Sequence, residues 1–385
     1  MRKVKNEIHH KMNAPKRSRY LFLVFSLLIL GTTQSGFSQT NAWFTHQSED
    51  GNVQNLEEYM KSSGVTGLSL VVLNDLKLDT SITLGYRNAD DQSPITEETM
   101  FNAGAMSATM YQYLALKAAS EGRIDLDAPV LKYLTTWKFP EKGWMKKDPV
   151  TVRDLMLQNR RYSVGYKSKG QTRGSSIPSF ADILAGKAEG PALEVTKRKN
   201  KSGNYSYGGH LILRAMLEDV YGVRIETAIE EEILEPLEME NSLFLPSLFN
   251  DPSLNVASGY RQDGTPIPGG HYDYPIMCSG GLWTTPTDYA KFVKYIFQAA
   301  SGDDFFLLEE LAQQAITAQN DSRCLIFNKG MDLYIGGASQ GYYTTFGGKH
   351  ETGTIVIVFT NSDINWKFTN QVAGMGWEFS RRNQQ

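Results

Sequence analysis

The most informative segment of this 385-residue chain is Phe101-Asn102-Ala103-Gly104-Ala105-Met106-Ser107-Ala108-Thr109-Met110. It opens a helix predicted over 107–121, because Met110, Leu114 and Ala118 recur at helical spacing and Gly122 follows as a stop signal. Ala105 and Ala108 stand one turn apart at its start. An alanine methyl group has no lone pair to attack a carbonyl and no amine to accept a proton.

On either side of this helix the sequence predicts an α+β layout. Strands are expected near both ends of the chain, with a mainly helical stretch between them, roughly 105–290. The expected strands are 66–73, one ending at 83–86, two near 332–335 and 341–346, and 354–361; the expected helices are 54–63, 151–158, 179–186, 208–221, one starting at Thr285-Pro286, and 366–380.

Five segments in order resemble landmarks of the serine β-lactamase and DD-peptidase superfamily, most nearly its class C-type serine hydrolases. They are 101–110, 121–134, 150–156, 236–242 and 279–288, the last of which reads Ser279-Gly280-Gly281-Leu282-Trp283-Thr284-Thr285-Pro286-Thr287-Asp288. The resemblance implies a β-lactamase/transpeptidase-like fold, an antiparallel sheet flanked by helices plus a mainly helical lobe, within a domain of residues 39–385.

The resemblance also places the reactive positions. The family's serine nucleophile falls on Ala105, its lysine on Ala108, and the cation or imidazole of its third motif on Ile335. The tyrosine of the second motif is retained as Tyr205, in Tyr205-Ser206-Tyr207. With no partner to activate, Tyr205 is expected to pack as a hydrogen-bonded tyrosine. The His350-Glu351-Thr352-Gly353 segment imitates the third motif but is expected to form an exposed hairpin turn.

Ligand contacts are expected from Ser107, Tyr207, Gly337, Gln340 and Tyr342. For Ser107 a buried or capping role is favoured over a substitute nucleophile, because it points roughly 200° around the helix from position 105. Tyr207 replaces a small amide and can fill the space in which a substrate would lie.

The N-terminus predicts export. Basic residues precede the apolar run 20–30, and small and polar residues end at Ser38, which indicates a signal peptide over 1–38; an uncleaved anchor is the alternative, and Met12 is a candidate start. Removal of 1–38 takes away seven Lys/Arg and one Glu, which moves the formal charge from −3 to −9. Such an acidic periplasmic or extracellular protein is not expected to bind nucleic acid, and no integral membrane segment is expected after signal removal.

The cysteines and the basic loops give weaker indications of function. Cys278 and Cys324 can pair or remain as buried free thiols, and the sequence does not decide between the two. The arginines of Gln158-Asn159-Arg160-Arg161-Tyr162 can recognise a carboxylate, although a solvated loop is favoured, as it is for the basic stretch 197–201. No metal motif and no cofactor-binding motif is present, so no metal or cofactor is expected.

Three functions follow from this pattern. The favoured one is a catalytically inactive pseudoenzyme whose cleft binds a peptide, a cell-wall fragment or an ester-like ligand. The second is an active esterase or peptidase with a displaced nucleophile, such as Ser107, Ser206 or Ser339 with Tyr205. The third is an interaction scaffold whose site is filled. An open cleft would favour the first, and a cleft plugged by Tyr207 the third.

Overall fold

The computed structural model describes residues 44–47, 53–167, 170–199, 207–248, 253–303, 306–319, 323–364 and 366–383. Tyr205, Ser206 and the predicted signal peptide lie outside these residues. None of the helices in the described ranges is both long and apolar enough to cross a membrane.

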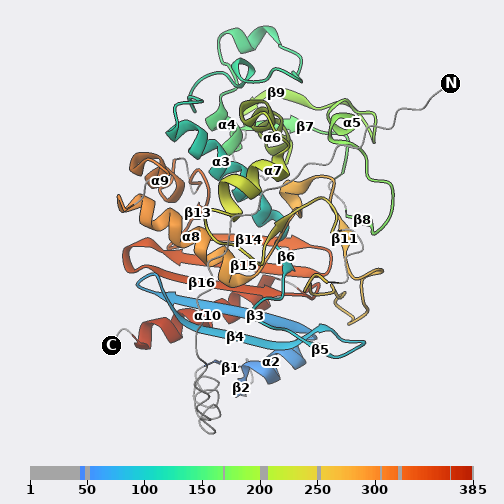
Figure 1. Ribbon diagram of the computed structural model, residues 1–385, viewed down its shortest axis with the longest axis vertical. Helices are drawn as coiled ribbons and strands as arrows, with labels where there is room; N and C mark the ends of the chain where they lie inside the picture. Colours follow the sequence, from blue (N-terminus) through green and yellow to red (C-terminus); the bar gives the residue numbers. More distant parts are fainter. Residues whose placement is uncertain are drawn as a thin grey trace, which may run out of the picture.

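A seven-stranded antiparallel sheet forms the centre of the molecule (Figure 1). Its order is β13-β14-β15-β16-β3-β4-β5, so the first and last parts of the chain interleave, as the sequence predicts. The strands are β3 Gly67–Asn74, β4 Lys77–Asn88, β5 Ser93–Pro94, β13 Asn328–Lys329, β14 Leu333–Ser339, β15 Tyr342–Lys349 and β16 Thr354–Thr360.

Alternation along the central strands gives the sheet two buried faces. Leu70 and Val72 of β3 join one apolar cluster, whereas Val71 and Leu73 join the other, because successive side chains point to opposite sides of a strand. Helices α2 (Leu56–Ser62) and α10 (Trp366–Asn383) cover the first face. Helix α8 (Pro286–Ala300) packs on the second, toward the helical part of the molecule (Figure 1).

The helical part consists of short segments around α3 and α6. Its members are α3 Ala108–Ser120, α4 Val152–Met156, α5 Phe180–Leu184, α6 Tyr207–Tyr221, α7 Ile225–Ile229, the π-helical turn η4 Glu230–Leu234 and α9 Glu309–Ile316. The 3₁₀ turns are η1 Gly104–Ser107, η2 Val130–Lys132, η3 Gly143–Lys146, η5 Met277–Ser279 and η6 His350–Thr352. The remaining strands are β1 Thr45–Gln47, β2 Val53–Asn55, β6 Phe101–Asn102, β7 Arg160–Ser163, β8 Gln171–Thr172, β9 Glu194–Lys199, β10 Leu243–Phe244, β11 Tyr272–Asp273 and β12 Leu282–Thr284.

Two local predictions are confirmed. The Thr285 side chain caps α8 by accepting a hydrogen bond from the Asp288 N–H, with Pro286 in the first turn. The His350–Thr352 turn joins β15 to β16, has no buried residue and closes at Gly353 with φ 58°. It is therefore the hairpin turn that the sequence predicts, not a part of the site.

Candidate functional site

Ala105 faces solvent from an otherwise buried turn. It belongs to η1, in which Gly104, Met106 and Ser107 are buried, and η1 runs directly into α3. Strand β14 lies against this turn: a Cβ on Gly104, whose φ is 55°, would be 2.6 Å from the Ala338 nitrogen. Close packing of backbone on backbone thus fixes Ala105 beside the C-terminal end of β14.

A cleft of about 570 Å³ opens in front of Ala105. Its lining includes Tyr207, Gln340 and Ser339, from three separate parts of the chain. Tyr207 donates a hydrogen bond to the carbonyl oxygen of Tyr166, which holds its ring at the wall. Tyr207 therefore narrows the site without plugging it. The remaining lining residues are Gly170, Tyr274, Ser279, Ala338, Tyr343 and Asp363.

Behind Ala105 lies a smaller cavity of about 100 Å³, which we call the inner chamber. Ala105, Ala108 and Ile335 all line it, so the structure brings these three predicted positions together. Helical spacing places Ala108 one turn below Ala105, and β14 supplies Ile335 from the opposite side. The other lining residues are Gln112, Met156, Gln158, His210, Arg323, Cys324, Ile326, Phe327, Asn328 and Gly336.

The inner chamber is polar at its far end but has no acidic side chain among the described residues that line it. The Gln158 amide nitrogen lies 3.4 Å from the ring nitrogens of His210. Burial and, secondarily, the positive charge of Arg323 lower the pKa of His210 to about 4, so the imidazole is neutral at pH 7. A lysine at position 108 would lie in the same chamber as Arg323, with no carboxylate partner among the described lining residues.

Two predicted ligand contacts do not face the cleft or the chamber. Ser107 is fully buried, donates to the Gly104 carbonyl and accepts from the Leu282 N–H, so the prediction of a ligand contact is wrong and the buried-serine interpretation holds. Tyr342 is also buried, and its hydroxyl donates to the carbonyls of Ala257 and Gly270. Alternation along β15 turns Tyr342 into the core while Tyr343 lines the cleft.

Gln340 does line the cleft, whereas Gly337 lines a neighbouring hollow on the outer side of β14. Gly337 has a packing role as well, because it sits against the carbonyl oxygen of Ala103.

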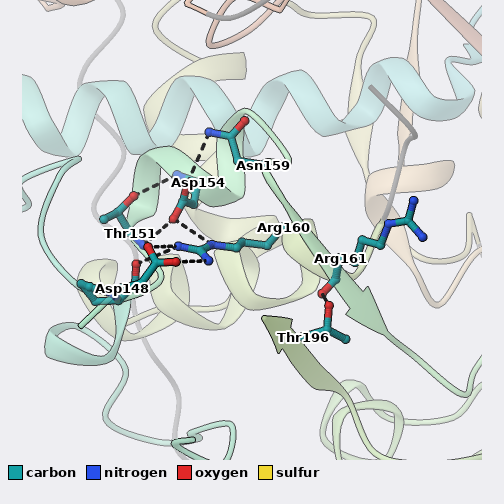
Figure 2. Close-up of polar contacts among 8 residues, drawn as sticks. Asp148, Thr151, Asp154, Asn159, Arg160, Arg161 and Thr196 are labelled. Carbon is teal, nitrogen blue, oxygen red and sulfur yellow. Dashed lines mark hydrogen bonds and ion pairs between the residues drawn. The ribbon is translucent and has the colours of Figure 1, made fainter. Parts of the chain in front are cut away.

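The expectation of a solvated arginine loop is wrong for Arg160. Its guanidinium is buried, with hydrogen bonds of 2.8 and 2.6 Å to the two oxygens of Asp148 and an ion pair of 3.4 Å to Asp154 (Figure 2). The Trp144 ring packs against the guanidinium, with 5.4 Å between Arg160 Cζ and the ring centroid. Arg161 points away from this network (Figure 2). Arg160 therefore holds the α4–β7 connection and is not available to a ligand.

Cys278 and Cys324 are free and buried. Cys324 lines the inner chamber, and burial raises the pKa of its thiol to about 12, so the thiol is protonated and a weak nucleophile. Among the described residues, no cluster of three or more His, Cys, Asp or Glu side chains is placed to hold a metal ion.

Sequence reasoning missed the polar residues of the inner chamber. For His210 a signal was present, because it follows Tyr207 by three residues on α6 and so shares a helix face with it. Gln158 lies two residues after the end of α4 and adopts φ 53°, an uncommon conformation for a residue other than glycine. Arg323 lies in a segment without any motif, and only the tertiary structure brings it to the site.

Comparison with known proteins agrees with this architecture. The family model described as "Beta-lactamase" matches residues 53–371. Among curated proteins, the teichoic acid D-alanine hydrolase of Staphylococcus aureus is 24% identical over 253 residues, which are 66% of this chain and 59% of that protein. The chain thus aligns with less than two thirds of the length of this relative.

Solved structures share the fold at low identity. FmtA from Staphylococcus aureus has a TM-score of 0.64 and 22% identity, covering 83% of this chain and 85% of that one. The D-amino acid amidase from Ochrobactrum anthropi SV3, solved with D-phenylalanine, has a TM-score of 0.67 and 17% identity, covering 86% and 97% of the two chains. A penicillin-binding protein homologue from Pyrococcus abyssi has a TM-score of 0.62 and 23% identity, covering 85% and 76%.

Proposed function

Because this chain belongs to the β-lactamase family, we propose that it is an exported, non-catalytic member that binds an acyl-type ligand in the cleft beside Ala105. The leader-like residues 1–38 support export. The described part of the site supports binding without covalent chemistry.

One observation carries this proposal: the residue that faces the open cleft from η1 is an alanine. The position retains its exposure and its place against β14, but a methyl group cannot form an acyl-enzyme. Ala108 and Ile335 line the chamber behind it, so the groups that would activate a nucleophile are replaced together. A maintained cleft with a deleted nucleophile favours recognition over turnover.

The ligand class follows from the cleft and from the relatives. Neutral polar groups such as Gln340 and Ser279 suit a peptide or ester carbonyl, and Tyr207 supplies an aromatic wall. The names of two similar proteins, a teichoic acid D-alanine hydrolase and a D-amino acid amidase, both refer to D-amino-acyl substrates. We therefore expect a D-amino-acyl ester or amide, carried by a peptide or a cell-wall fragment.

A displaced nucleophile would have to come from a serine in the cleft. Among the described residues, Ser279 and Ser339 line it, whereas Ser107 is excluded by its burial; Tyr205 and Ser206 lie outside the described residues. Ser339 sits beside Tyr274, whose pKa is raised to about 12 by burial, so that hydroxyl is a poor proton acceptor at pH 7. The non-catalytic assignment is therefore favoured.

The test combines covalent labelling with binding. The purified chain is incubated with a fluorophosphonate and with a fluorescent penicillin, and its intact mass is measured; no stoichiometric adduct is expected. Binding of N-acetyl-D-alanine methyl ester is then followed by calorimetry for the natural chain, Gln340→Ala and Gln319→Ala. Gln340 lines the cleft, whereas Gln319 is exposed elsewhere, so only the first substitution should weaken binding.

An adduct of one probe per chain that disappears when a single serine is replaced would overturn the non-catalytic assignment. Absence of any binding, or equal loss in the two glutamine variants, would overturn the cleft as the ligand site.

A further inference from the structure

A second hollow, of about 550 Å³, lies on the outer side of β14, and we call it the outer groove. It meets the cleft at Ala105, which lines both. Its volume falls within the range of about 300–1,000 Å³ that is usual for small-molecule sites. A ligand with one group at Ala105 can therefore extend into the groove.

The groove is a consequence of strand alternation and of where α10 begins. Leu333 and Ser339 of β14 are buried, whereas Tyr334, Gly336 and Ala338 face outward. Helix α10 covers β15, β16 and β3 and starts at Trp366, which stands at the side of the groove.

Small residues leave the bottom of the groove open, and two aromatic residues line its sides. Gly336 and Ala338 form the floor, and a Cβ on Gly336 would meet only the Thr344 carbonyl oxygen, at 3.7 Å. Tyr334 and Trp366 line the same groove while remaining 48% and 68% exposed. Two large aromatic side chains that stay exposed to solvent beside an open groove are typical of a surface that a ligand covers.

The polar groups of the groove are neutral. No Asp, Glu, Lys or Arg is among the described residues that line it. The Thr345 hydroxyl lies 3.0 Å from that of Thr369 and 3.5 Å from the Asn370 amide oxygen. That contact engages the oxygen of Asn370, so its amide nitrogen is the atom that can donate to a ligand.

We propose that the outer groove binds a neutral pyranose ring of a glycan, and this inference rests on the proposed function in placing the acyl-type group in the adjoining cleft. The C–H faces of a pyranose pack on aromatic rings, and its hydroxyl or acetamido groups hydrogen-bond with amides and hydroxyls. A charged ligand would lose its hydration with no opposite charge in return. An acyl chain would cover Asn370 and offer no hydrogen bond to its amide nitrogen.

The probe is the tetramer of N-acetylglucosamine, with binding measured by calorimetry and by tryptophan fluorescence. Trp366→Ala and Tyr334→Ala are each expected to weaken binding at least tenfold. Gly336→Val fills the floor while keeping both rings, and should do the same. Tyr86→Ala is the matched control, because Tyr86 is 42% exposed on β4, outside the groove, and its loss should leave binding unchanged.

Circular dichroism of each variant verifies folding, which is expected because the two aromatic rings are largely exposed. Lack of binding by the tetramer, binding that persists in Trp366→Ala, or preferential binding of dodecanoate would each overturn the glycan assignment. Calorimetry with N-acetyl-D-alanine methyl ester separates the two proposals. If the ester binds and the tetramer does not, only the groove assignment fails; if the tetramer binds and the ester does not, the proposed function fails.

Discussion

Gly337 of β14 lies so close to Ala103 that a Cβ on Gly337 would be 2.0 Å from the Ala103 carbonyl oxygen. The Thr344 hydroxyl lies 3.2 Å from the carbonyl oxygens of both residues and so joins them. This contact sets the distance between the turn that presents Ala105 and the strand that forms the opposite side of the site.

Gly337→Ala should therefore destabilise the protein and disturb the cleft. The added methyl group forces η1 and β14 apart, at a cost of about 1–3 kcal/mol in unfolding free energy. Urea unfolding and ester binding measure the two effects. Gly336→Ala is the control, because its Cβ would meet only one atom, at 3.7 Å, and unfolding should be nearly unchanged. Equal stabilities of the two variants would contradict the proposed role of this contact.

Restoring the serine and lysine should not restore activity. In Ala105→Ser with Ala108→Lys, the ammonium enters a chamber that holds Arg323 and Ile335 and no acidic residue among those described. Burial of an unpaired cation lowers its pKa and costs several kcal/mol. We expect a less stable protein with little or no nitrophenyl-ester turnover, measured against Ala105→Ser alone.

Adding Ile335→His and Tyr207→Asn to that double variant should recover more turnover, because the first change places an imidazole in the chamber of the new lysine and the second places an amide in the adjoining cleft. Robust turnover by the double variant alone would show that the pocket is still organised for catalysis and would weaken the non-catalytic assignment.

Removal of Arg160 should be strongly destabilising. Arg160→Ala leaves Asp154 partly buried without its cation and removes the contact with Trp144, which predicts a loss of about 3–5 kcal/mol. Arg161→Ala serves as the control, with a change within about 0.5 kcal/mol, because its side chain points out of the network (Figure 2). Thermal unfolding distinguishes the two, and similar melting temperatures would show that the Asp148–Arg160 ion pair contributes little.

His271 should make the protein sensitive to acid. Burial and, secondarily, the charge of Arg173 lower the pKa of His271 from 6.5 to about 4, and its Nε2 lies 4.0 Å from Asp273 Oδ1. The unfolded chain takes up the proton first. Above pH 6.5 the protonation of His271 therefore takes nothing from the unfolding free energy. As the pH falls from about 6.5 to 4, the unfolding free energy falls by up to about 3 kcal/mol on account of this group. In His271→Gln, unfolding free energy should fall less steeply over this range; an unchanged slope would contradict the pKa shift.

Much of the fold was predictable because the signals are local. The nearly continuous apolar runs of β3 and β16 require a sheet that is buried on both faces. Helical spacing after Ala105 requires a helix whose first turn is presented at one end. The resemblance then gave the order of the landmarks, and it led to Ile335, which lines the inner chamber together with Ala105 and Ala108. Ser107 could be interpreted as buried for the same reason, since the helix turns it away from position 105.

The rest depended on residues that meet only in three dimensions. The amino-acid sequence is enough to establish that positions 105 and 108 carry methyl groups, and hence that serine and lysine chemistry is absent from them. Three-dimensional packing was needed to establish that the space in front of Ala105 is open, that Arg323 and His210 lie behind it, and that Tyr334 and Trp366 line a groove. A cavity is the volume left when distant segments pack, so no local pattern of side chains encodes its size or its lining.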